Sequence, residues 1–284
     1  MTEKERFIGG FKLVSAIGGG RDGEVWAAIT PEGSAVAVKL FPEGSEDRAR
    51  EEYETGLLFD HPNLLRPLSF GTEGGRPYMV MPFCEGRSLD NLAGYLREEM
   101  AWKLFRDISE GLAYLHSGGY CHADVKPSNI LWDGERFLLS DFGACFGRGG
   151  QRRSDDASSY RFAAPGKDRS AADDIWSLGA SVFNAVMGSH LFNGLGGQAQ
   201  RKESPLPIMR KSMPELSALV IRCLDFDPGK RPSAEDIMRI AGEGLENCRS
   251  AGKIRPARSL QGASVKGVHE DFWPEKMKES SDLQ

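Results

Sequence analysis

The chain has 284 residues, and its 36 Lys and Arg against 41 Asp and Glu give a formal net charge of -5. This mild acidity argues against a general nucleic-acid-binding protein. Hydrophobic residues make up 40% and charged residues 27% of the chain, which excludes a collagen-like or wholly disordered protein. No segment approaches the ~18 consecutive apolar residues of a membrane span. The length is sufficient for one large domain or for two lobes, with a buried core.

The cysteines point to a reducing compartment. All five are scattered, without the close pairs of a metal-binding knuckle, and their odd number disfavours a disulfide framework. The N-terminal segment MTEKERFIGG is charged where a secretory signal peptide requires an apolar stretch. We therefore expect a cytoplasmic protein with reduced thiols that binds neither membranes nor nucleic acid.

The N-terminal part of the chain is predicted to be mostly antiparallel sheet. Alternating apolar and β-branched residues predict short strands, and a charge-rich stretch whose apolar residues cluster late predicts one inserted helix. The expected strands cover residues 11–17, 24–29, 35–41, 64–70 and 77–81, and the expected helix covers 45–59.

Helical periodicity dominates from about Leu89 onward. The segment 244–284 lacks periodicity and mixes charges with Ser, Gly and Pro, so we expect a flexible tail in which Phe272 and Trp273 are candidates for docking. The fold class is therefore α+β, with a small β-rich lobe followed by a larger helical lobe. The expected helices of the second lobe cover 100–116, 174–186, 216–224 and 234–241, the last with Ser233 as its N-cap.

Glycine is over-represented, at 34 of 284 residues or about 12%, against ~7% on average. The pattern Gly18-x-Gly20-x-x-Gly23-x-Val25 lies between two expected strands and not between a strand and a long helix. This context favours a β-hairpin flap whose backbone approaches phosphates over a dinucleotide-binding crossover. Taken alone, most such patterns are plain turns.

Lys39 ends the apolar strand Val36-Ala-Val-Lys and precedes a helix that contains candidate carboxylates. A lysine in an apolar strand is more often an edge residue than a functional one. If a helix carboxylate holds it, however, its ammonium group can bind the phosphate oxygens of a nucleotide.

The densest polar cluster is His122-Ala-Asp124-Val-Lys126-Pro-Ser-Asn129, followed by Asp141-Phe-Gly143. Its two carboxylates, its amide and its lysine can supply a base, two hard oxygen ligands for Mg²⁺ and a cation for phosphate. A polar loop with an Asx turn explains any one of these motifs by itself. It does not explain the ordered set.

In this order the motifs resemble those of the eukaryotic-like (Hanks-type) serine/threonine protein kinases. The resemblance covers residues 11–241 and includes the segments GGGRDGEV, VAVK, HPN, HADVKPSN, DFG, AAPG, DIWSLG and DPGKRPS. It implies the bilobal protein-kinase fold, with a kinase domain over 7–243 that consists of an N-lobe (about 7–81), a hinge (82–86) and a C-lobe (87–243). It also implies ATP and Mg²⁺ as cofactors and proteins carrying Ser or Thr as substrates; the oligomeric state stays open.

The resemblance assigns a role to each matching residue. Asp124 would accept the proton of the substrate hydroxyl, Lys126 would steady the γ-phosphate, and Lys39 would hold the α- and β-phosphates. Glu52 would pair with Lys39, with Glu54 or Glu51 as the alternatives. The expected Mg²⁺ ligands are Asn129 and Asp141, and the residues expected to cover the phosphates, enclose the adenine or form the hinge are Ile17, Gly18, Gly20, Gly23, Val25, Ala37, Met81 (the gatekeeper position), Pro82, Phe83, Cys84 and Leu131.

Two departures from the family pattern concern the catalytic loop and the activation segment. Ala123 replaces the arginine of His-Arg-Asp, which implies that switching by phosphorylation of the activation loop is absent. Gly166 replaces the glutamate of Ala-Pro-Glu and so leaves Arg231 in need of another acid, for which Asp168 and Asp173 are the candidates.

Two further departures lie in the N-terminal lobe. Asp22 stands at the tip of the glycine loop, where an aromatic residue is usual, and would repel phosphates unless it points outward. Gly56 stands where the family places a leucine, and we expect it to weaken its helix and to leave a gap in the hydrophobic packing.

Three functional hypotheses follow. All residues expected to act on ATP and Mg²⁺ are retained, which favours an active kinase, and Lys126, two residues after Asp124, is typical of the serine/threonine group. The four departures motivate a pseudokinase or scaffold that binds nucleotide or a partner with little phosphotransfer. A small-molecule kinase of related fold is the third hypothesis, and both the Lys-Pro pair of the loop and the Ala-Pro segment count against it.

Overall fold

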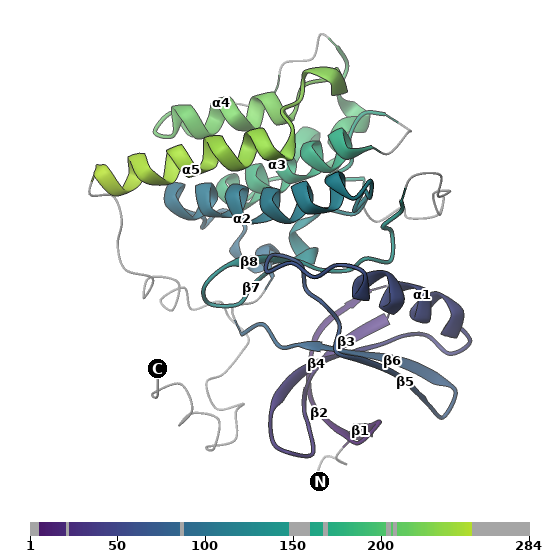
Figure 1. Ribbon diagram of the computed structural model, residues 1–284. Coiled ribbons are helices and arrows are strands. Elements are labelled where there is room, and N and C mark those ends of the chain that lie inside the picture. The colour runs from purple at the N-terminus through teal and green to yellow at the C-terminus, as the bar shows by residue number, and fades with distance from the viewer. Residues whose placement is uncertain are drawn as a thin grey trace.

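The computed structural model describes residues 6–20, 23–85, 88–147, 160–166, 170–202, 206 and 209–251. Within this part the chain forms two lobes, a β-sheet with one helix and a mainly helical lobe that follows it in the sequence (Figure 1). This is the bilobal α+β architecture that the sequence predicts.

The N-lobe is a six-stranded antiparallel sheet in the order β1-β2-β3-β4-β6-β5. Because side chains alternate across a strand, one set of apolar residues gathers in a small core that includes Val38, Leu40 and Val80. The strands are β1 (Arg6–Ile8), β2 (Phe11–Gly20), β3 (Gly23–Ile29), β4 (Ala35–Leu40), β5 (Ser69–Glu73) and β6 (Arg76–Pro82).

The strand expected over 64–70 is wrong for its first half. The strand β5 begins only at Ser69, and Leu64 instead forms an isolated parallel bridge with Leu139 of the other lobe. Pro67, which has no N–H to give to a strand ladder, stands between this bridge and β5. The segment therefore ties the two lobes together before it joins the sheet.

The N-lobe helix, α1 (Glu46–Leu57), packs against β5 and β6. Its first turn carries two acidic residues, which suit the positive end of a helix dipole. Tyr53 stacks on Phe70 of β5 with ring centroids 5.6 Å apart, and the buried face of the helix carries one carboxylate, that of Glu52. The packing of α1 thus directs a single acid into the interior.

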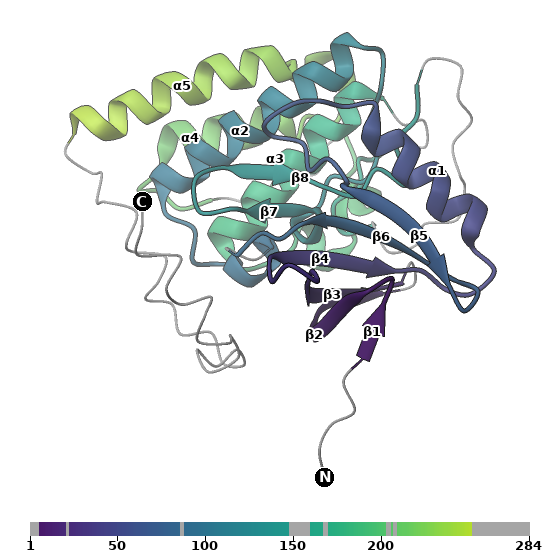
Figure 2. The same ribbon diagram turned by 60° about the horizontal axis from the view of Figure 1, so that its bottom comes forward.

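The C-lobe has a core of helices covered on one side by a small β-ribbon. The helices are α2 (Glu98–Ser117), α3 (Ala171–Met187), α4 (Pro214–Cys223) and α5 (Ala234–Ser250), and the short 3₁₀ turns are η1 (Leu89–Leu92), η2 (Pro127–Asn129), η4 (Leu191–Gly194), η5 (Gly196–Ala199) and η6 (Pro228–Lys230). The ribbon of β7 (Ile130–Trp132) and β8 (Phe137–Leu139) lies between these helices and the N-lobe sheet (Figure 2). Within the described part of the chain, no helix combines the length and the apolar character that a membrane span requires.

The last helix is longer than the sequence predicts. It begins as expected, with the Ser233 side chain accepting a hydrogen bond from the amide of Asp236, but it continues to Ser250, into the segment assigned to the tail. Its apolar face also continues, because Gly244 packs directly on Trp102 of α2, where a Cβ would lie 2.5 Å from a ring atom. The rest of the tail, including Phe272 and Trp273, lies outside the described residues.

The gap expected at Gly56 does not exist. A Cβ at this position would lie 2.8 Å from Cδ of Pro67 and 3.4 Å from Cδ2 of Phe142, so the space that a larger side chain would use is already filled. Pro67 comes from the connection before β5, and Phe142 from the loop that follows β8. Glycine here allows the helix to pack closely against both of them.

Replacing Gly56 with leucine, the residue that the family places there, is expected to destabilise the fold by ~1–3 kcal/mol, because the new side chain must displace Pro67 or Phe142. Chemical denaturation measures this change in the free energy of unfolding. The matched control is Gly242→Ala, at a helical position where a Cβ meets no atom within 4 Å and where alanine is intrinsically favoured over glycine. Unchanged or increased stability in Gly56→Leu would contradict the packing described here.

Candidate active site

The site begins with a buried ion pair in the N-lobe. Lys39, near the end of β4, and Glu52, on the inner face of α1, are only 6% and 4% exposed. The Lys39 Nζ atom lies 2.6 Å from Glu52 Oε1. Of the three glutamates considered from the sequence, Glu52 is therefore the one that meets the lysine. A buried charge is tolerated only when it is paired, so each of these two residues holds the other in place.

The same lysine reaches the C-lobe. Its Nζ atom lies 3.6 Å from Oδ2 of Asp141. Asp141 has a positive φ of 68°, and the amide of Gly143 donates to its Oδ1 at 3.3 Å. Burial would raise the pKa of Asp141, but the ammonium groups of Lys39 and Lys126 outweigh it and lower that pKa. The carboxylate is therefore held in its charged form.

Asp124 lies at the centre of the loop that precedes β7. The Lys126 Nζ atom is 2.6 Å from Asp124 Oδ2. Asn129 donates from Nδ2 to the main-chain oxygen of Asp124 at 3.0 Å and to its Oδ2 at 3.1 Å. The turn η2, which Pro127 begins, brings the amide back to the carboxylate. The structure thus places a lysine and an amide within hydrogen-bond distance of the same carboxylate.

A second buried acid, Asp174, holds the backbone of this loop by hydrogen bonds. Asp174, near the start of α3, accepts hydrogen bonds from the main-chain amides of His122 at 2.9 Å and Ala123 at 2.8 Å. Ala123 has a positive φ of 64°, a conformation that is uncommon for a residue with a Cβ. The two hydrogen bonds to Asp174 fix the backbone in this conformation.

His116 completes this support, a role that sequence reasoning does not predict. Its Nε2 atom lies 2.9 Å from Asp174 Oδ2. The two residues are 58 positions apart in the chain, so no spacing rule connects them. The only local signal is that His116 occupies the last turn of α2, where a basic residue suits the helix dipole.

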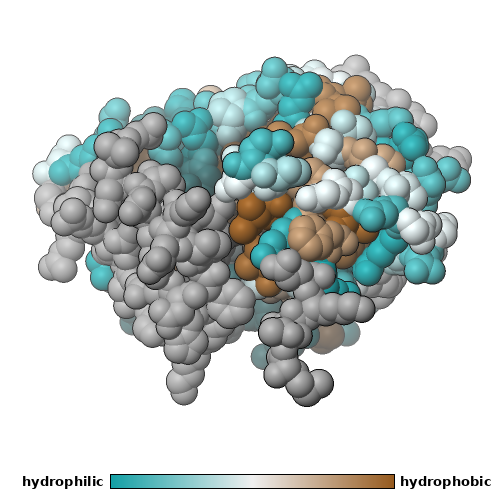
Figure 3. Space-filling model, turned by 90° about the horizontal axis from the view of Figure 1, so that it is seen from below, coloured by the Kyte–Doolittle hydropathy of each residue, from teal (hydrophilic) through white to brown (hydrophobic). Residues whose placement is uncertain are grey.

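The residues expected around a nucleotide share one face of the sheet. Ladder pairs join Gly18 to Val25, Val25 to Lys39, and Ala37 to Met81, and residues paired across strands point to the same side. Figure 3, which views the whole molecule from below, shows apolar side chains near the middle of the visible surface. Among the described residues of this lobe, the exposed large hydrophobic residues are Phe7, Ile17, Leu58 and Leu68.

The connection between the lobes follows β6 directly. Pro82, Phe83 and Cys84 are half-buried there, and burial raises the pKa of the Cys84 thiol to about 11. Leu131 of β7, which is also half-buried, forms a bridge with Ser88 just beyond this connection. These residues lie where the N-lobe sheet meets the β-ribbon of the C-lobe.

The three glycines of the hairpin between β2 and β3 are not equivalent. Gly23 has a φ of 130°, and a Cβ there would lie 2.1 Å from the main-chain oxygen of Leu40, so the fold itself requires glycine. Gly20 meets nothing within 4 Å, and Gly18 meets only the Val25 side chain at 3.7 Å. The latter two therefore leave space above the sheet that their own packing does not use. Asp22 lies outside the described residues.

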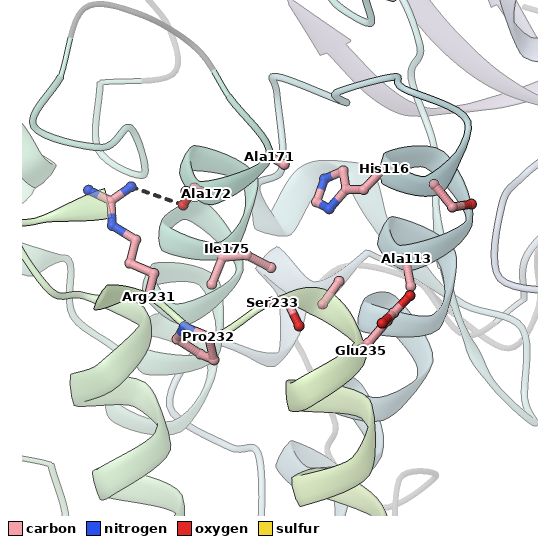
Figure 4. A pocket seen from close by; sticks show the side chains of 11 residues that line it. Ala113, His116, Ala171, Ala172, Ile175, Arg231, Pro232, Ser233 and Glu235 are labelled. Carbon is pink, nitrogen blue, oxygen red and sulfur yellow. Dashed lines mark hydrogen bonds between the residues drawn. The ribbon is translucent and has the colours of Figure 1, made fainter. Parts of the chain in front are cut away.

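Arg231 finds its acid on α3. Its Nη1 atom lies 2.7 Å from Oδ1 of Asp173 and donates to the main-chain oxygen of Ala172 at 2.9 Å. Figure 4 shows the guanidinium beside the start of α3, at the rim of a pocket that His116 and Ile175 also line. The arginine left without the family's glutamate is thus paired within the helical core. The other candidate, Asp168, lies outside the described residues.

With this geometry in place, the comparison with known families decides the identity of the fold. The model of the protein kinase domain matches residues 11–241 of the chain. The chain belongs to the protein kinase family. Its relatives place it in the eukaryotic-like (Hanks-type) serine/threonine group, as the sequence motifs predict.

The curated relatives are distant and mostly longer. The chain is 30% identical to an Aurora kinase of Schizosaccharomyces pombe over 256 residues, covering 83% of this chain and 72% of that protein. It is 32% identical to the serine/threonine-protein kinase PknK of Mycobacterium tuberculosis over 249 residues, covering 79% of this chain and 22% of that protein. It is also 28% identical to sperm motility kinase 2A of Mus musculus, covering 84% of this chain and 50% of that protein.

Acidification is expected to destabilise the kinase domain below about pH 6.5. Burial lowers the pKa of His122 from its ordinary value of 6.5, and burial also lowers the pKa values of His61 and His190. As the pH falls through ~6.5, the unfolded chain therefore binds more protons than the folded chain, and the free energy of unfolding decreases.

Denaturant titrations between pH 7 and pH 5 measure this loss. In His122→Gln the decrease in stability with falling pH is expected to be smaller than in the wild type, because one of the three groups no longer titrates. Comparison of slopes is independent of any constant destabilisation that the substitution causes. Equal slopes in the two proteins would show that His122 does not contribute.

Proposed function

We propose that this chain is an active serine/threonine protein kinase that transfers the γ-phosphoryl group of ATP to hydroxyl groups of protein substrates. The observation that carries the proposal is the double contact of Lys39, which meets Glu52 at 2.6 Å and Asp141 at 3.6 Å. In this family the lysine–glutamate pair and the metal-binding aspartate must both be in place for phosphoryl transfer.

The side chains around this contact suit the steps of the reaction. Asp124 accepts the proton of the substrate hydroxyl, and Lys126, beside it, neutralises charge on the transferred phosphoryl group. Lys39 binds the α- and β-phosphates, while the backbone of Gly18 and Gly20 has room to approach them. The low local exposure of the loop strengthens these electrostatic contacts.

Mg²⁺ fits the oxygen donors of the site. No group of three or more His, Cys, Asp or Glu side chains in the described part of the chain is arranged to hold a metal alone. Mg²⁺ usually binds through one or two protein carboxylates together with substrate phosphates, and Asp141 and Asn129 supply a carboxylate and an amide oxygen for that purpose. When bound, the ion would supply positive charge that neutralises the phosphates of the nucleotide.

The adenine would lie between the sheet and the β-ribbon. Val25 and Ala37 would cover it from above and Leu131 from below, while Ile17 and Gly23 belong to the flap at its edge. Main-chain groups of the hinge, from Pro82 to Cys84 beside the gatekeeper Met81, offer hydrogen bonds to its rim. This arrangement agrees with the mostly apolar lining and few polar groups that are typical of small-ligand sites.

The alternative is a pseudokinase or scaffold. Two of the departures that favoured this alternative, at Gly56 and Gly166, are compensated in the structure. Gly56 packs against Pro67, and Arg231 pairs with Asp173. Ala123 argues against control by a phosphorylated activation loop but leaves Asp124 in place. A cytoplasmic location is part of the proposal and is supported by the five free thiols.

Substitution of Asp124 by asparagine is expected to reduce phosphotransfer by ~10²–10⁴-fold, because it removes the general base, while ATP binding is retained. Radiolabelled ATP with myelin basic protein, or the chain itself, as acceptor measures the transfer, and phosphoamino-acid analysis should find label on Ser and Thr but not on Tyr.

The matched control is Asp60→Asn. Its carboxylate is 87% exposed and forms a surface ion pair with Arg66 at 3.6 Å. Phosphotransfer by this variant should therefore stay at the wild-type level. Equal incorporation of label by the wild type and Asp124→Asn would contradict the proposal of an active kinase and favour the pseudokinase.

A further inference from the structure

The segment 160–166 precedes α3 in the chain and, by resemblance, belongs to the activation segment and to the surface that holds a protein substrate. Residue 166 is a glycine, where the family has the glutamate that pairs with an arginine. In this chain Arg231, the matching arginine, is occupied by Asp173 and by the main-chain oxygens of Ala172 and Asp225. Among the described residues, these contacts of Arg231 do not reach the segment 160–166, so other residues must hold the segment.

The loop that carries η4 and η5 makes that contact with its backbone. The amide of Gly197 donates to the main-chain oxygen of Ala163 at 2.9 Å. A Cβ at Gly197 would lie 2.4 Å from the main-chain nitrogen of Pro165 and 2.5 Å from the carbonyl carbon of Ala164. These are backbone atoms, which cannot rotate away as a flexible side chain can. The loop and the segment 160–166 can therefore lie this close only because residue 197 is glycine.

Gly196 makes a similar contact one residue earlier. It has a φ of 54°, and a Cβ there would lie 2.2 Å from the main-chain oxygen of Tyr160. Both Gly196 and Gly197 are buried. Two successive glycines thus lie under both ends of the same segment, which is held against them along its backbone.

The loop that carries η4 and η5 contains two residues in an unfavourable backbone conformation. Phe192 and Asn193 both adopt left-handed backbone conformations, with φ of 46° and 57°, which residues with a Cβ rarely take up. Such strain persists only where the surrounding structure imposes it and is concentrated at functional sites. The strained turn delivers Gly196 and Gly197 to the segment.

The anchored segment also makes a side-chain contact with the start of the loop that carries η4 and η5. Phe162 is buried and meets His190 edge to face, with ring centroids 5.4 Å apart. Burial raises the pKa of the Asp90 carboxyl group, and the nearby charges of His190 and Lys126 oppose that shift. His190 and Lys126 thus both interact electrostatically with the Asp90 carboxyl group.

We infer that Gly197, together with Gly196, is a positioning residue for the protein substrate: it anchors the segment 160–166 by direct backbone contact, in place of the family's glutamate–arginine ion pair. The inference rests on the proposed function, because it concerns the surface that presents a peptide to Asp124. It assigns no chemical role to either glycine.

The test compares Gly197→Ala with Gly242→Ala, which adds the same methyl group where a Cβ has no neighbour within 4 Å. In Gly197→Ala the kcat/KM for a protein substrate is expected to fall at least ~10-fold, mainly through KM, because a misplacement of ~1 Å can cost ~10²-fold. The KM for ATP should stay within about twofold of the wild type, as should all constants of Gly242→Ala.

A second arm measures hydrogen exchange and does not depend on catalysis. Amides of the segment 160–166 should exchange faster in Gly197→Ala than in Gly242→Ala, and the Gly197 amide of the wild type should be protected. An unprotected Gly197 amide in the wild type overturns the inference, whether or not the variant folds. Failure of the wild type to transfer phosphate defeats the proposed function alone, because this arm still decides the anchor.

A third arm tests the ion pair. Asp173→Asn should leave the KM for the protein substrate unchanged, because Arg231 does not hold the segment. If Asp173→Asn raises that KM as much as Gly197→Ala does, or if Gly197→Ala leaves both the KM and the exchange unchanged, the anchor is not the glycine contact and the inference is wrong.

Discussion

The buried ammonium group of Lys39 is the point on which the two lobes depend. Its charge is compensated by Glu52 on one side and by Asp141 on the other, and breaking a buried pair by removing one partner is strongly destabilising. The close approach needs small residues, because a Cβ on Gly143 would lie 3.0 Å from Glu52 Oε2. The position of α1, the end of β4 and the loop after β8 are therefore one coupled arrangement.

Two of the four departures from the family pattern are matched by other residues of the chain. Where a leucine is missing at Gly56, Pro67 fills the space; where a glutamate is missing at Gly166, Asp173 pairs with Arg231. The contacts are redistributed among residues that are neighbours in space and not in sequence. The tertiary packing thus keeps the family's architecture with different side chains.

Periodicity was sufficient for most of the fold, and the two lobes and the main helices follow from local patterns. The central residues of the site, including the pairing of Lys39 with Glu52, follow from the resemblance to the protein kinases, which left Glu54 and Glu51 as alternatives. The late start of β5 at Ser69 does not, because a bridge from Leu64 to Leu139 in the other lobe competes with the sheet. The extension of α5 depends on the contact of Gly244 with Trp102, and the packing at Gly56 on two distant residues. Such features are decided by tertiary contacts that a linear pattern does not contain.

The hydrogen bonds of Asp174 have a consequence for control of the molecule. The conformation of Ala123, and with it the loop that bears Asp124, is set by an acid in the helical core. In this arrangement the loop is held by contacts within the C-lobe, which do not involve a charge on the activation segment. We therefore expect the activity proposed for this chain to depend on the amount of the protein and on the supply of its substrates, and not on phosphorylation of its activation segment.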